Sequence, residues 1–412
     1  MADAPPYPVN IGPIHPALKE PTMFKFQIKG EQIVGVDFQP GFNHRGIEFM
    51  GMRRNPLQTL HLTERVCGIC SAAHQFVFTR AVEHAAEIVP TERADYLRTI
   101  VAELERIHSH LLWAGVAGHE LGFDSILYYT WQMREDVQDV LEYLTGNRVN
   151  HAFYIFGGVR RDVTDEGISK AKKMIAKYRK MEDTVLDIFL TDPTIIHRTK
   201  DVGVLTHENA QRLCACGPLT RAAGVPKDIR FDWPHAAYGD MLDDFKVVTP
   251  ETGGYKATGD VFCQVVVRLL EVFESVRMID WCLDRLPSGP ITSEPNLSAL
   301  LMAKLRNAEG EGVGRVEAPR GEDIHYVRLK KGKMEVDSWK VRVPTYGNIM
   351  SWVTMFPGEQ IADIPIIIAS IDPCIGCMDR VTLVDSVTGK EEVLTWERLH
   401  EMSMKKQRGL KP

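Results

Sequence analysis

The stretch Thr91 to Leu111 reads TERADYLRTIVAELERIHSHL. Its apolar residues recur at steps of three and four positions: Leu97, Ile100, Val101, Leu104, Ile107 and Leu111. This spacing is typical of an amphipathic helix, because residues three and four apart lie on the same helical face. The stretch therefore predicts a long helix that begins near Thr91 and packs one face against a core.

Three later stretches share this period and predict further helices. They run from about Ser125 to Leu144, from Asp165 to Leu190 and from Gly259 to Leu286. Gly146 and Pro287 follow the first and the last of these stretches, and both residue types commonly end helices. Together the four helices predict a helical bundle at the centre of the molecule.

Alternating apolar and polar residues predict β-hairpins near both ends of the chain. The first covers residues 22–39 and turns at Gly30-Glu31. The second pairs 325–330 with 334–343, and the third pairs 381–384 with 392–396. The expected fold class is therefore α+β and mainly α, with a helical bundle core and peripheral β-hairpins.

The chain has no internal repeat, low-complexity tract or clear linker, so we expect one large domain over residues 1–412. Within it we expect the N-terminal hairpin, a helical core at 91–290 and a C-terminal tail at 381–412. The stretch Arg221 to Gly254 is rich in turn residues and predicts a long surface excursion.

The composition is that of an ordinary globular protein, with 44% hydrophobic and 25% charged residues and a formal net charge of -6. A negative net charge argues against general binding to nucleic-acid backbones. Met1 to Pro6 lack the basic and apolar regions of a secretory signal, and the longest apolar stretch, Ile364 to Ile371, is too short to cross a bilayer. We therefore expect no signal peptide, no transmembrane segment and no nucleic-acid partner.

Two C-x-x-C pairs lie near opposite ends of the chain: Cys67 with Cys70, and Cys374 with Cys377. Such a pair can turn two sulfurs toward one metal ion, and Gly68 and Gly376 suit tight turns. Thiolates favour zinc, copper(I), nickel or iron-sulfur centres over magnesium or calcium. Structural zinc modules usually keep their pairs close in sequence, so here a large fold would have to assemble the site. Buried cysteines without a metal are the alternative.

The residues around both pairs resemble those of the large, catalytic subunit of NiFe hydrogenases. The pattern R-x-C-G-x-C-x-x-x-H is met from Arg65 to His74, and the pattern D-P-C-x-x-C-x-x-R from Asp372 to Arg380. Two further blocks agree, Glu317-Ala318-Pro319-Arg320-Gly321 and Gly12-Pro13-Ile14-His15-Pro16. The resemblance extends over essentially the whole chain.

Other blocks resemble the membrane-bound, energy-converting branch of that family, group 4. They are His44-Arg45-Gly46, Glu105 to His110, Gly157 to Asp162 and Gly259-Asp260-Val261. The same blocks are similar to the quinone-site subunit of respiratory complex I, which lacks the nickel-binding cysteines. Retention of all four cysteines therefore favours a hydrogenase.

The resemblance implies a nickel ion held by Cys67, Cys70, Cys374 and Cys377, and an iron ion bridged to it by Cys70 and Cys377. In the family this iron carries carbon monoxide and cyanide ligands. Arg320 resembles the arginine that overhangs the open metal position, and Asp372 the carboxylate that orients it. An ordinary structural ion pair is the alternative for these two residues.

Three more residues are expected at the cofactor. Pro319 precedes Arg320 in the matched block, and Thr345 resembles the hydroxyl residue that hydrogen-bonds a cyanide, although Tyr346-Gly347-Asn348 departs from the usual continuation. His74 is expected to support the first cysteine loop.

Proton transfer is assigned to Glu20, where this branch has a glutamate proposed to relay protons from a nickel-bound thiolate. A carboxylate beside a desolvated metal site can have its pKa moved toward neutrality, which suits a relay. A simple surface charge beside Lys19 is the alternative. His108 and His110 lie on the predicted long helix, either in a buried polar network that conducts protons or on a partly solvated face.

The implied activity is that of an oxidoreductase, the catalytic subunit of an energy-converting NiFe hydrogenase that reversibly reduces protons to dihydrogen. A ferredoxin-like donor would supply electrons through a small subunit with a proximal 4Fe-4S cluster, so iron-sulfur clusters are expected in partner subunits only. Membrane subunits similar to complex I modules would couple the reaction to ion translocation, and would hold this chain at the cytoplasmic face. The alternatives are a complex I-like subunit that reduces quinone or a sulfur compound without nickel, and a zinc-stapled assembly subunit.

In many family members a protease removes the residues after the third position beyond the last cysteine. Here that cut would follow Arg380 and delete the tail 381–412. The tail itself predicts a hairpin and a short helix from Trp396, so a retained tail is the alternative.

Overall fold

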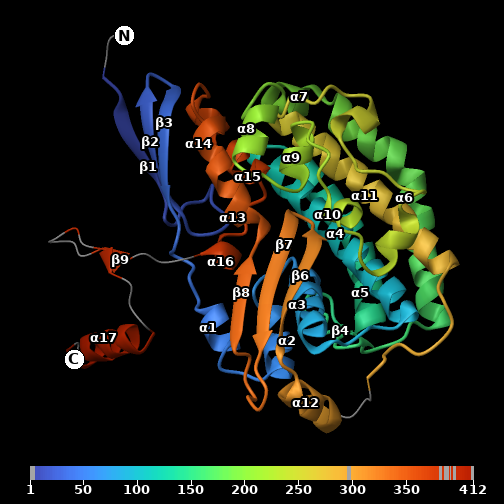
Figure 1. Ribbon diagram of the computed structural model, residues 1–412. Helices are drawn as coiled ribbons and strands as arrows, with labels where there is room; N and C mark the ends of the chain where they lie inside the picture. Colours follow the sequence, from blue (N-terminus) through green and yellow to red (C-terminus); the bar gives the residue numbers. More distant parts are fainter. Residues whose placement is uncertain are drawn as a thin grey trace.

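The four predicted long helices form one side of the molecule (Figure 1). They are α4 (Glu92–Glu120), α5 (Asp124–Thr145), α6 (Asp165–Thr191) and α11 (Val261–Asp284). The Thr91 side chain accepts a hydrogen bond from the Ala94 N–H at 3.3 Å and caps α4, and Gly146, with a φ of 88°, ends α5. The computed structural model describes residues 5–294, 298–379, 383–384, 389, 391–392 and 396–409. It confirms the predicted class, α+β and mainly α.

A three-stranded antiparallel sheet lies beside the helices and carries a tight turn toward the centre of the molecule. Its strands are β6 (Gly310–Ala318), β7 (Gly321–Leu329) and β8 (Ser338–Arg342), in that order. The sequence predicted β7 and β8 but not β6, whose alternate glycines hide the apolar pattern. Those glycines let α3 (Ser71–Ala86) approach the strand, since a Cβ on Gly312 would lie 1.9 Å from the Ala81 carbonyl oxygen.

The N-terminal hairpin belongs to a second antiparallel sheet. Its strands are β1 (Tyr7–Ile11), β2 (Met23–Lys29) and β3 (Gln32–Gln39), with β2 in the middle. The strand β1 was not predicted. Phe24 and Phe26 pack edge-on against Trp352 and Phe356, with ring centroids 4.9 and 5.0 Å apart. This contact anchors the sheet, and the connection between β1 and β2 then passes the cysteine loops.

Short helices fill the rest of the core and the edges. The α-helices are α1 (Ile47–Gly51), α2 (Pro56–Thr63), α7 (Pro193–Thr199), α8 (His207–Arg212), α9 (Pro218–Ala222), α10 (Ile229–Asp232), α12 (Ser298–Asn307), α13 (Pro344–Asn348), α14 (Trp352–Met355), α15 (Ile364–Ser370) and α16 (Ile375–Met378). The 3-10 helices are η1 (Ala236–Met241), η2 (Pro250–Gly253), η3 (Ile349–Ser351) and η4 (Ile361–Asp363), and β4 (Tyr154–Ile155) pairs with β5 (Gly158–Val159). No helix among the described residues is long and apolar enough to span a membrane.

The predicted surface excursion over residues 221–254 is wrong for its first part. Arg221, Asp228 and Arg230 are almost completely buried and belong to an ion-pair network between α4 and α11. Arg221 contacts Glu271 of α11 at 2.6 Å, and Arg230 contacts Glu103 of α4 at 3.2 Å. Turn residues predict local chain reversals. They do not predict that charged residues within the same segment, such as Arg221 and Arg230, will pair with carboxylates on distant helices and become buried.

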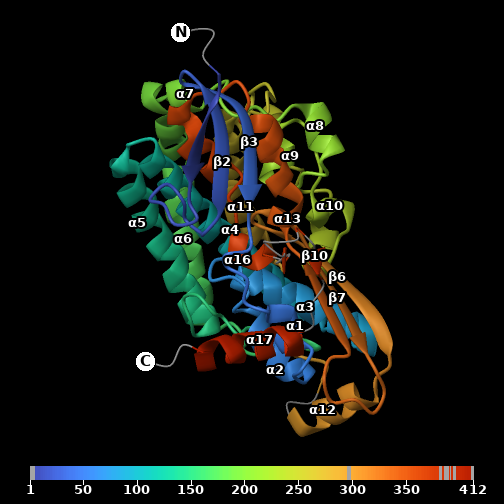
Figure 2. The same cartoon turned by 90° about the vertical axis from the view of Figure 1, so that its left-hand side faces the viewer.

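The described part of the tail contains the strands and the helix that its sequence predicts. Strand β9 (Leu383–Val384) pairs antiparallel with β10 (Glu391–Glu392), and α17 (Trp396–Gly409) follows. Arg53, just beyond α1, contacts Glu397 at 2.5 Å, and Figure 2 shows α17 in front of α1 and α2. Arg380, where a processing cut is expected, lies outside the described residues.

Candidate metal centre

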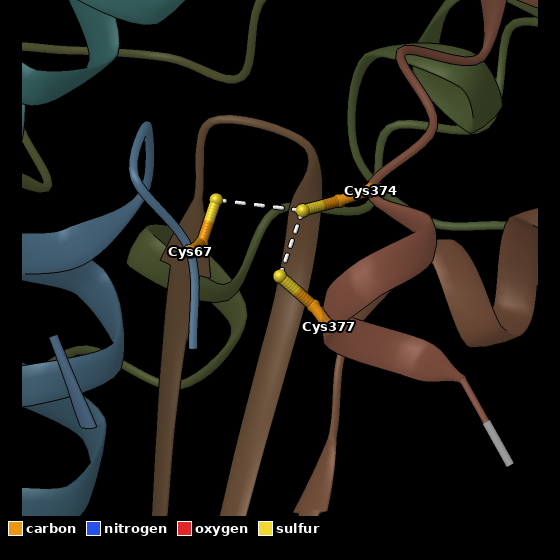
Figure 3. A group of neighbouring side chains, drawn as sticks. All are labelled: Cys67, Cys374 and Cys377. Atoms are coloured by element: carbon orange, nitrogen blue, oxygen red, sulfur yellow. Dashed lines mark hydrogen bonds between the residues drawn. The ribbon is translucent and has the colours of Figure 1, made fainter. Parts of the chain in front are cut away.

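Two loops from opposite ends of the chain bring cysteine sulfurs together. Cys67 and Cys70 lie between α2 and α3, and Cys374 and Cys377 lie at α16. The Cys67 sulfur is 3.4 Å from that of Cys374, which is 2.7 Å from that of Cys377 (Figure 3). All four cysteines are buried and free of disulfide bonds. Gly68 and Gly376, which we expected in tight turns, both have a negative φ.

The fourth sulfur faces a guanidinium group. Arg320 Nη1 donates to Cys70 Sγ at 2.9 Å. Because the three other sulfurs lie within 4.8 Å of one another, the donor set at this position consists of buried thiols with one fixed cation beside them. Buried, soft donors of this kind match nickel, zinc or an iron-sulfur centre, and do not match magnesium or calcium.

The pKa values of the four thiols are shifted in different directions. Hydrogen bonds from the Cys374, Cys377 and Cys70 thiols, in that order, hold the pKa of Cys67 well below its usual range. The pKa of Cys377 is raised well above its usual range, chiefly by burial. A soft metal ion that binds here must therefore displace protons, so its affinity is expected to fall on acidification.

Arg320 occupies the two-residue turn between β6 and β7, directly after Pro319. Its Nη2 donates to Asp372 Oδ1 at 2.8 Å and its Nε donates to the Asp372 carbonyl at 2.9 Å. A further bond runs from Nη1 to Ser109 Oγ of α4 at 3.2 Å. Asp372 has a φ of 51°, a left-handed conformation that non-glycine residues adopt rarely and at a cost.

One oxygen of this carboxylate is left without a partner. Asp372 Oδ2 is buried and has no hydrogen bond among the described residues, and burial raises the pKa of Asp372. Asp372 also lines the cavity that reaches the cysteine sulfurs. An unsatisfied buried acceptor is costly in a packed interior, and it fits a site that is completed by a further group.

The turn that carries Arg320 is held from behind by α4. Arg106 Nη2 donates to the Glu317 carbonyl at 2.6 Å and its Nη1 donates to the Ala318 carbonyl at 3.3 Å. The Glu317 side chain in turn contacts Arg221 at 2.7 Å. Arg106 lies in the block Glu105 to His110 that resembles the family. Neither the helical period of that block nor the charge of Arg106 predicted that it would hold the Arg320 turn.

Glu20 lies in the connection between β1 and β2 and contacts the second cysteine loop. It accepts hydrogen bonds from the N–H groups of Ile375 and Gly376, the latter at 3.2 Å, and from Asn43 Nδ2 at 3.3 Å. Burial raises the pKa of Glu20. Lys19 points elsewhere and contacts Glu120 at 2.5 Å. Glu20 is therefore part of the site rather than a simple surface charge paired with Lys19.

Thr345 supports the second cysteine loop directly. Its hydroxyl oxygen accepts a hydrogen bond from the Cys374 N–H at 3.0 Å, which leaves the hydroxyl proton available to another acceptor. Pro319 lies beside Ala73 and Glu105 in a small cavity behind the Arg320 turn. These contacts place Thr345 next to a cysteine, whereas Pro319 lies behind the turn that carries Arg320.

His74 belongs to a buried polar cluster behind the first cysteine loop. Its Nδ1 is 2.9 Å from Asp323 Oδ2 and 3.4 Å from His325 Nε2. The Trp339 indole, which can only donate, faces His325 Nδ1 at 3.3 Å, so His325 carries its proton on Nε2, toward the cluster. His74, Asp323 and His325 thus form one buried cluster, in which one ligand atom of each lies within 4.8 Å of the others.

His108 and His110 are both buried, as the first of the two sequence readings expected. His110 Nε2 lies 2.7 Å from Glu271 Oε2, and His108 Nε2 lies 2.7 Å from Arg134. His110 therefore joins the network of Arg221 and Glu271.

A cavity of about 360 Å³ reaches the cysteine sulfurs. Its walls are mostly apolar and come from α4, α15 and the first cysteine loop, while Glu20, Arg320 and Asp372 supply polar groups. A second cavity of about 180 Å³ lies on the other side, between α1, β8 and Cys377. The first cavity can admit small molecules to the thiols, and Arg45 and Val66 line both cavities.

Two family patterns match the chain. The respiratory-chain NADH dehydrogenase 49 kDa subunit matches residues 120–380, and the nickel-dependent hydrogenase family matches residues 45–114. The hydrogenase match contains Cys67 and Cys70, and the 49 kDa subunit match contains Cys374 and Cys377.

Individual proteins are similar over nearly their whole length. The chain is 44% identical over 406 residues to the membrane-bound hydrogenase subunit alpha of Pyrococcus furiosus, covering 98% of this chain and 94% of that protein. It is 37% identical over 378 residues to the carbon monoxide-induced hydrogenase of Rhodospirillum rubrum, covering 91% and 99%. A chain in the structure of the membrane-bound sulfane sulfur reductase, an archaeal respiratory complex, superposes with a TM-score of 0.83 at 27% identity, covering 92% of this chain and 100% of that one.

Proposed function

The chain belongs to the family of membrane-bound hydrogenase large subunits, which is related to the 49 kDa subunit of respiratory NADH dehydrogenase, and on this premise we propose that it is the catalytic subunit of an energy-converting NiFe hydrogenase. The proposed reaction is the reversible reduction of protons to dihydrogen. Members of this family are oxidoreductases.

The arrangement of the four cysteines carries this proposal. Both C-x-x-C pairs are present, buried and unoxidised, and the fold brings one sulfur of the first pair to within 3.4 Å of the second pair. A quinone-reducing relative has no need of four such thiols. The guanidinium of Arg320 beside the Cys70 sulfur also supplies a fixed positive charge where the proposed reaction would develop negative charge.

The residues present fit a nickel-iron centre. Cys67, Cys70, Cys374 and Cys377 would hold it, and when bound it would supply the redox chemistry that makes or splits dihydrogen. Asp372 fixes the Arg320 guanidinium through two hydrogen bonds, and Thr345 has a hydroxyl proton to donate toward the site. The cavity that reaches the sulfurs has mostly apolar walls.

Glu20 is placed to move a proton at its carboxylate. It contacts the backbone of the residues between Cys374 and Cys377 and lines the cavity. Burial raises the pKa of Glu20 above that of an ordinary carboxyl group, which makes protonation at this position easier. We assign to it the proton relay between the cysteine sulfurs and the solvent side.

The expected partners follow from the same proposal. A small subunit with a proximal 4Fe-4S cluster would deliver electrons from a ferredoxin-like input subunit, and membrane subunits similar to complex I modules would translocate ions. These partners would hold the chain at the cytoplasmic face of the membrane. The tail 381–412 would either be removed after Arg380 or be retained as α17 against α1.

A second function is favoured by two similarities. The match to the 49 kDa subunit covers most of the chain, and the sulfane sulfur reductase chain superposes along its full length. A complex I-like subunit that reduces quinone or a sulfur compound without nickel would keep this fold and the apolar cavity. It would not require the Arg320 guanidinium to face a thiol.

Metal analysis of the purified complex, combined with infrared spectroscopy in the carbonyl and cyanide stretching region, separates these functions. The hydrogenase proposal expects one nickel and one iron per chain at this site, together with those bands. A mature complex without nickel and without the bands would overturn it and favour the complex I-like function. Zinc in place of both metals would indicate an assembly subunit.

A further inference from the structure

One arginine binds both cysteine loops at once. Arg45 Nη2 donates to the Val66 carbonyl at 2.6 Å and to the Gly376 carbonyl at 2.7 Å, and its Nη1 donates to the Arg65 carbonyl at 2.9 Å. Arg65 and Val66 lead directly into Cys67, whereas Gly376 lies between Cys374 and Cys377. The guanidinium therefore joins the two halves of the thiol set through their main chains.

The second loop is shaped to admit this contact. A Cβ on Gly376 would lie 2.7 Å from Asn43 Nδ2, 3.1 Å from Glu20 Oε1 and 3.3 Å from Arg45 Nη2. Since Gly376 does not adopt a positive φ, the reason for glycine here is the close approach of these side chains rather than a turn. Cys377 adds a further link, because its sulfur contacts the Val66 carbonyl at 3.3 Å.

The segment that carries Arg45 is itself tied to the second loop. The Asp379 carboxylate accepts hydrogen bonds from the N–H groups of Gly41 and Asn43 at 3.0 and 2.6 Å. His44 Nδ1 contacts the Asp379 carbonyl at 3.1 Å. Residues 41–45 are thus hydrogen-bonded to the segment that carries Cys374 and Cys377. Arg45 connects this segment to the loop of Cys67.

We propose that Arg45 is a positioning residue that sets the spacing between the two cysteine pairs, and that Gly376 is required to let it do so. A charged fork that bonds three carbonyl groups restrains both loops more narrowly than neutral packing does. The metal readout of this proposal rests on the proposed function. Its geometric readout concerns the thiols alone.

The geometric test uses the metal-free full chain. Diamide oxidation joins two thiols that lie close enough in space, with loss of two protons and two electrons to diamide, and peptide mapping reports which pair has formed. In the wild type we expect a disulfide between Cys67 and Cys374 in competition with one between Cys374 and Cys377. Arg45→Met should lower the ratio of the first to the second at least about fivefold, because loss of the fork frees the spacing between loops but not within a loop.

Matched variants separate positioning from general damage. Arg54→Met removes an arginine just beyond α1 that also bonds a carbonyl, that of Met50 at 2.8 Å, and should leave the ratio unchanged. Arg45→Lys should recover part of the ratio, since an ammonium can reproduce the Nη2 contacts but not the third bond. Gly376→Ala should lower the ratio as Arg45→Met does, and it serves as the test if Arg45→Met does not fold.

A wild-type ratio in both Arg45→Met and Gly376→Ala would overturn the proposal. In the assembled complex, Arg45→Met should also shift or broaden the carbonyl and cyanide bands while α-helix content is kept. If the wild-type complex lacks those bands altogether, the proposed function fails, and the disulfide ratio still decides the role of Arg45.

Discussion

Arg320 holds Asp372 by its side chain and its main chain together, with Nη2 2.8 Å from Oδ1 and Nε 2.9 Å from the carbonyl oxygen. The same guanidinium contacts the Cys70 sulfur at 2.9 Å. Because one planar group makes all three contacts, its orientation over the thiols is fixed by the residue that begins the second cysteine loop.

This geometry predicts that Arg320→Lys keeps the metals but lowers hydrogen turnover by about 10²-fold, the order of loss seen when one preorganised charge donor is removed from an active site. An ammonium is a point donor and cannot reproduce the fork. Turnover and nickel content should be measured on the same preparation. Arg328 lies on β7 and forms a surface ion pair with Asp337. Arg328→Lys is therefore the matched control and should retain normal turnover. Normal turnover in Arg320→Lys, or an equal loss of turnover in Arg320→Lys and Arg328→Lys, would contradict the prediction.

Glu20→Gln should slow deuterium-proton exchange by about tenfold, which corresponds to about 1.4 kcal/mol in the barrier. The amide cannot take up and release a proton, but its oxygen can still accept one of the N–H groups at residues 375 and 376. Nickel content should therefore be retained, and Glu31→Gln in the exposed β2–β3 turn should change neither quantity. If nickel is lost instead, Glu20 is a structural acceptor for the second loop and not a relay.

Much of the fold could be predicted from short-range patterns. The start of α4 and both ends of α5, α6 and α11 agree with the predictions to within a few residues, because the apolar period of an amphipathic helix is visible in its own sequence. Strand β6 could not be predicted in this way. Its glycines at 310, 312 and 314 are required by the approach of α3, which is a property of two distant segments.

The candidate site divides in the same manner. Cys67, Cys374 and Arg320 stand in motifs whose residues signal metal chemistry, and the fold places them together. Arg45 also stands in a matched block, His44-Arg45-Gly46, but that block does not indicate a contact with the cysteine loops, since the partners of Arg45 are carbonyl groups that every residue possesses. Its role depends on which main-chain segments meet, so only the assembled structure could indicate it.

The buried ion pairs predict a large stability loss on removal of one partner. Arg221→Met leaves Glu271, Glu317 and Asp228 without their shared cation in the interior, and should lower the free energy of unfolding by about 3–5 kcal/mol. Arg148→Met also removes an arginine that contacts three carboxylates, but on the surface, and should cost about 0–1 kcal/mol. Denaturant unfolding of both variants checks the difference, and similar losses would contradict the assignment of a buried network.

The contact between β6 and α3 predicts a position that tolerates no side chain. Gly312→Ala places a methyl group 1.9 Å from the Ala81 carbonyl oxygen, so helix and strand must separate, at a cost of about 3 kcal/mol. Gly35→Ala on β3 meets only ordinary contacts at 3.8 Å with Gln27 and should cost less than about 1 kcal/mol. Thermal unfolding of the two variants gives the comparison. A small effect at Gly312 would show that the two segments can separate easily.

His110 predicts a defined pH dependence of stability. Burial lowers the pKa of His110 to about 4, although its Nε2 lies 2.7 Å from Glu271. In the unfolded chain the same imidazole titrates near its ordinary value of about 6.5. Between these values the unfolded chain binds a proton that the folded chain does not, so stability is lost as the pH falls from about 6.5 toward 4, by at most about 1.4 kcal/mol per pH unit.

The measurement compares His110→Gln with the wild type across this range. The variant retains a donor toward Glu271 but does not titrate, so the difference in unfolding free energy between the two proteins should narrow as the pH is lowered. His119→Gln, which alters an exposed imidazole paired with Asp124, should leave that slope unchanged. A difference between wild type and His110→Gln that stays constant from pH 6.5 to 4 would mean that His110 gains its proton equally in the folded and unfolded chains, and that the network around Glu271 accepts a buried positive charge at this position.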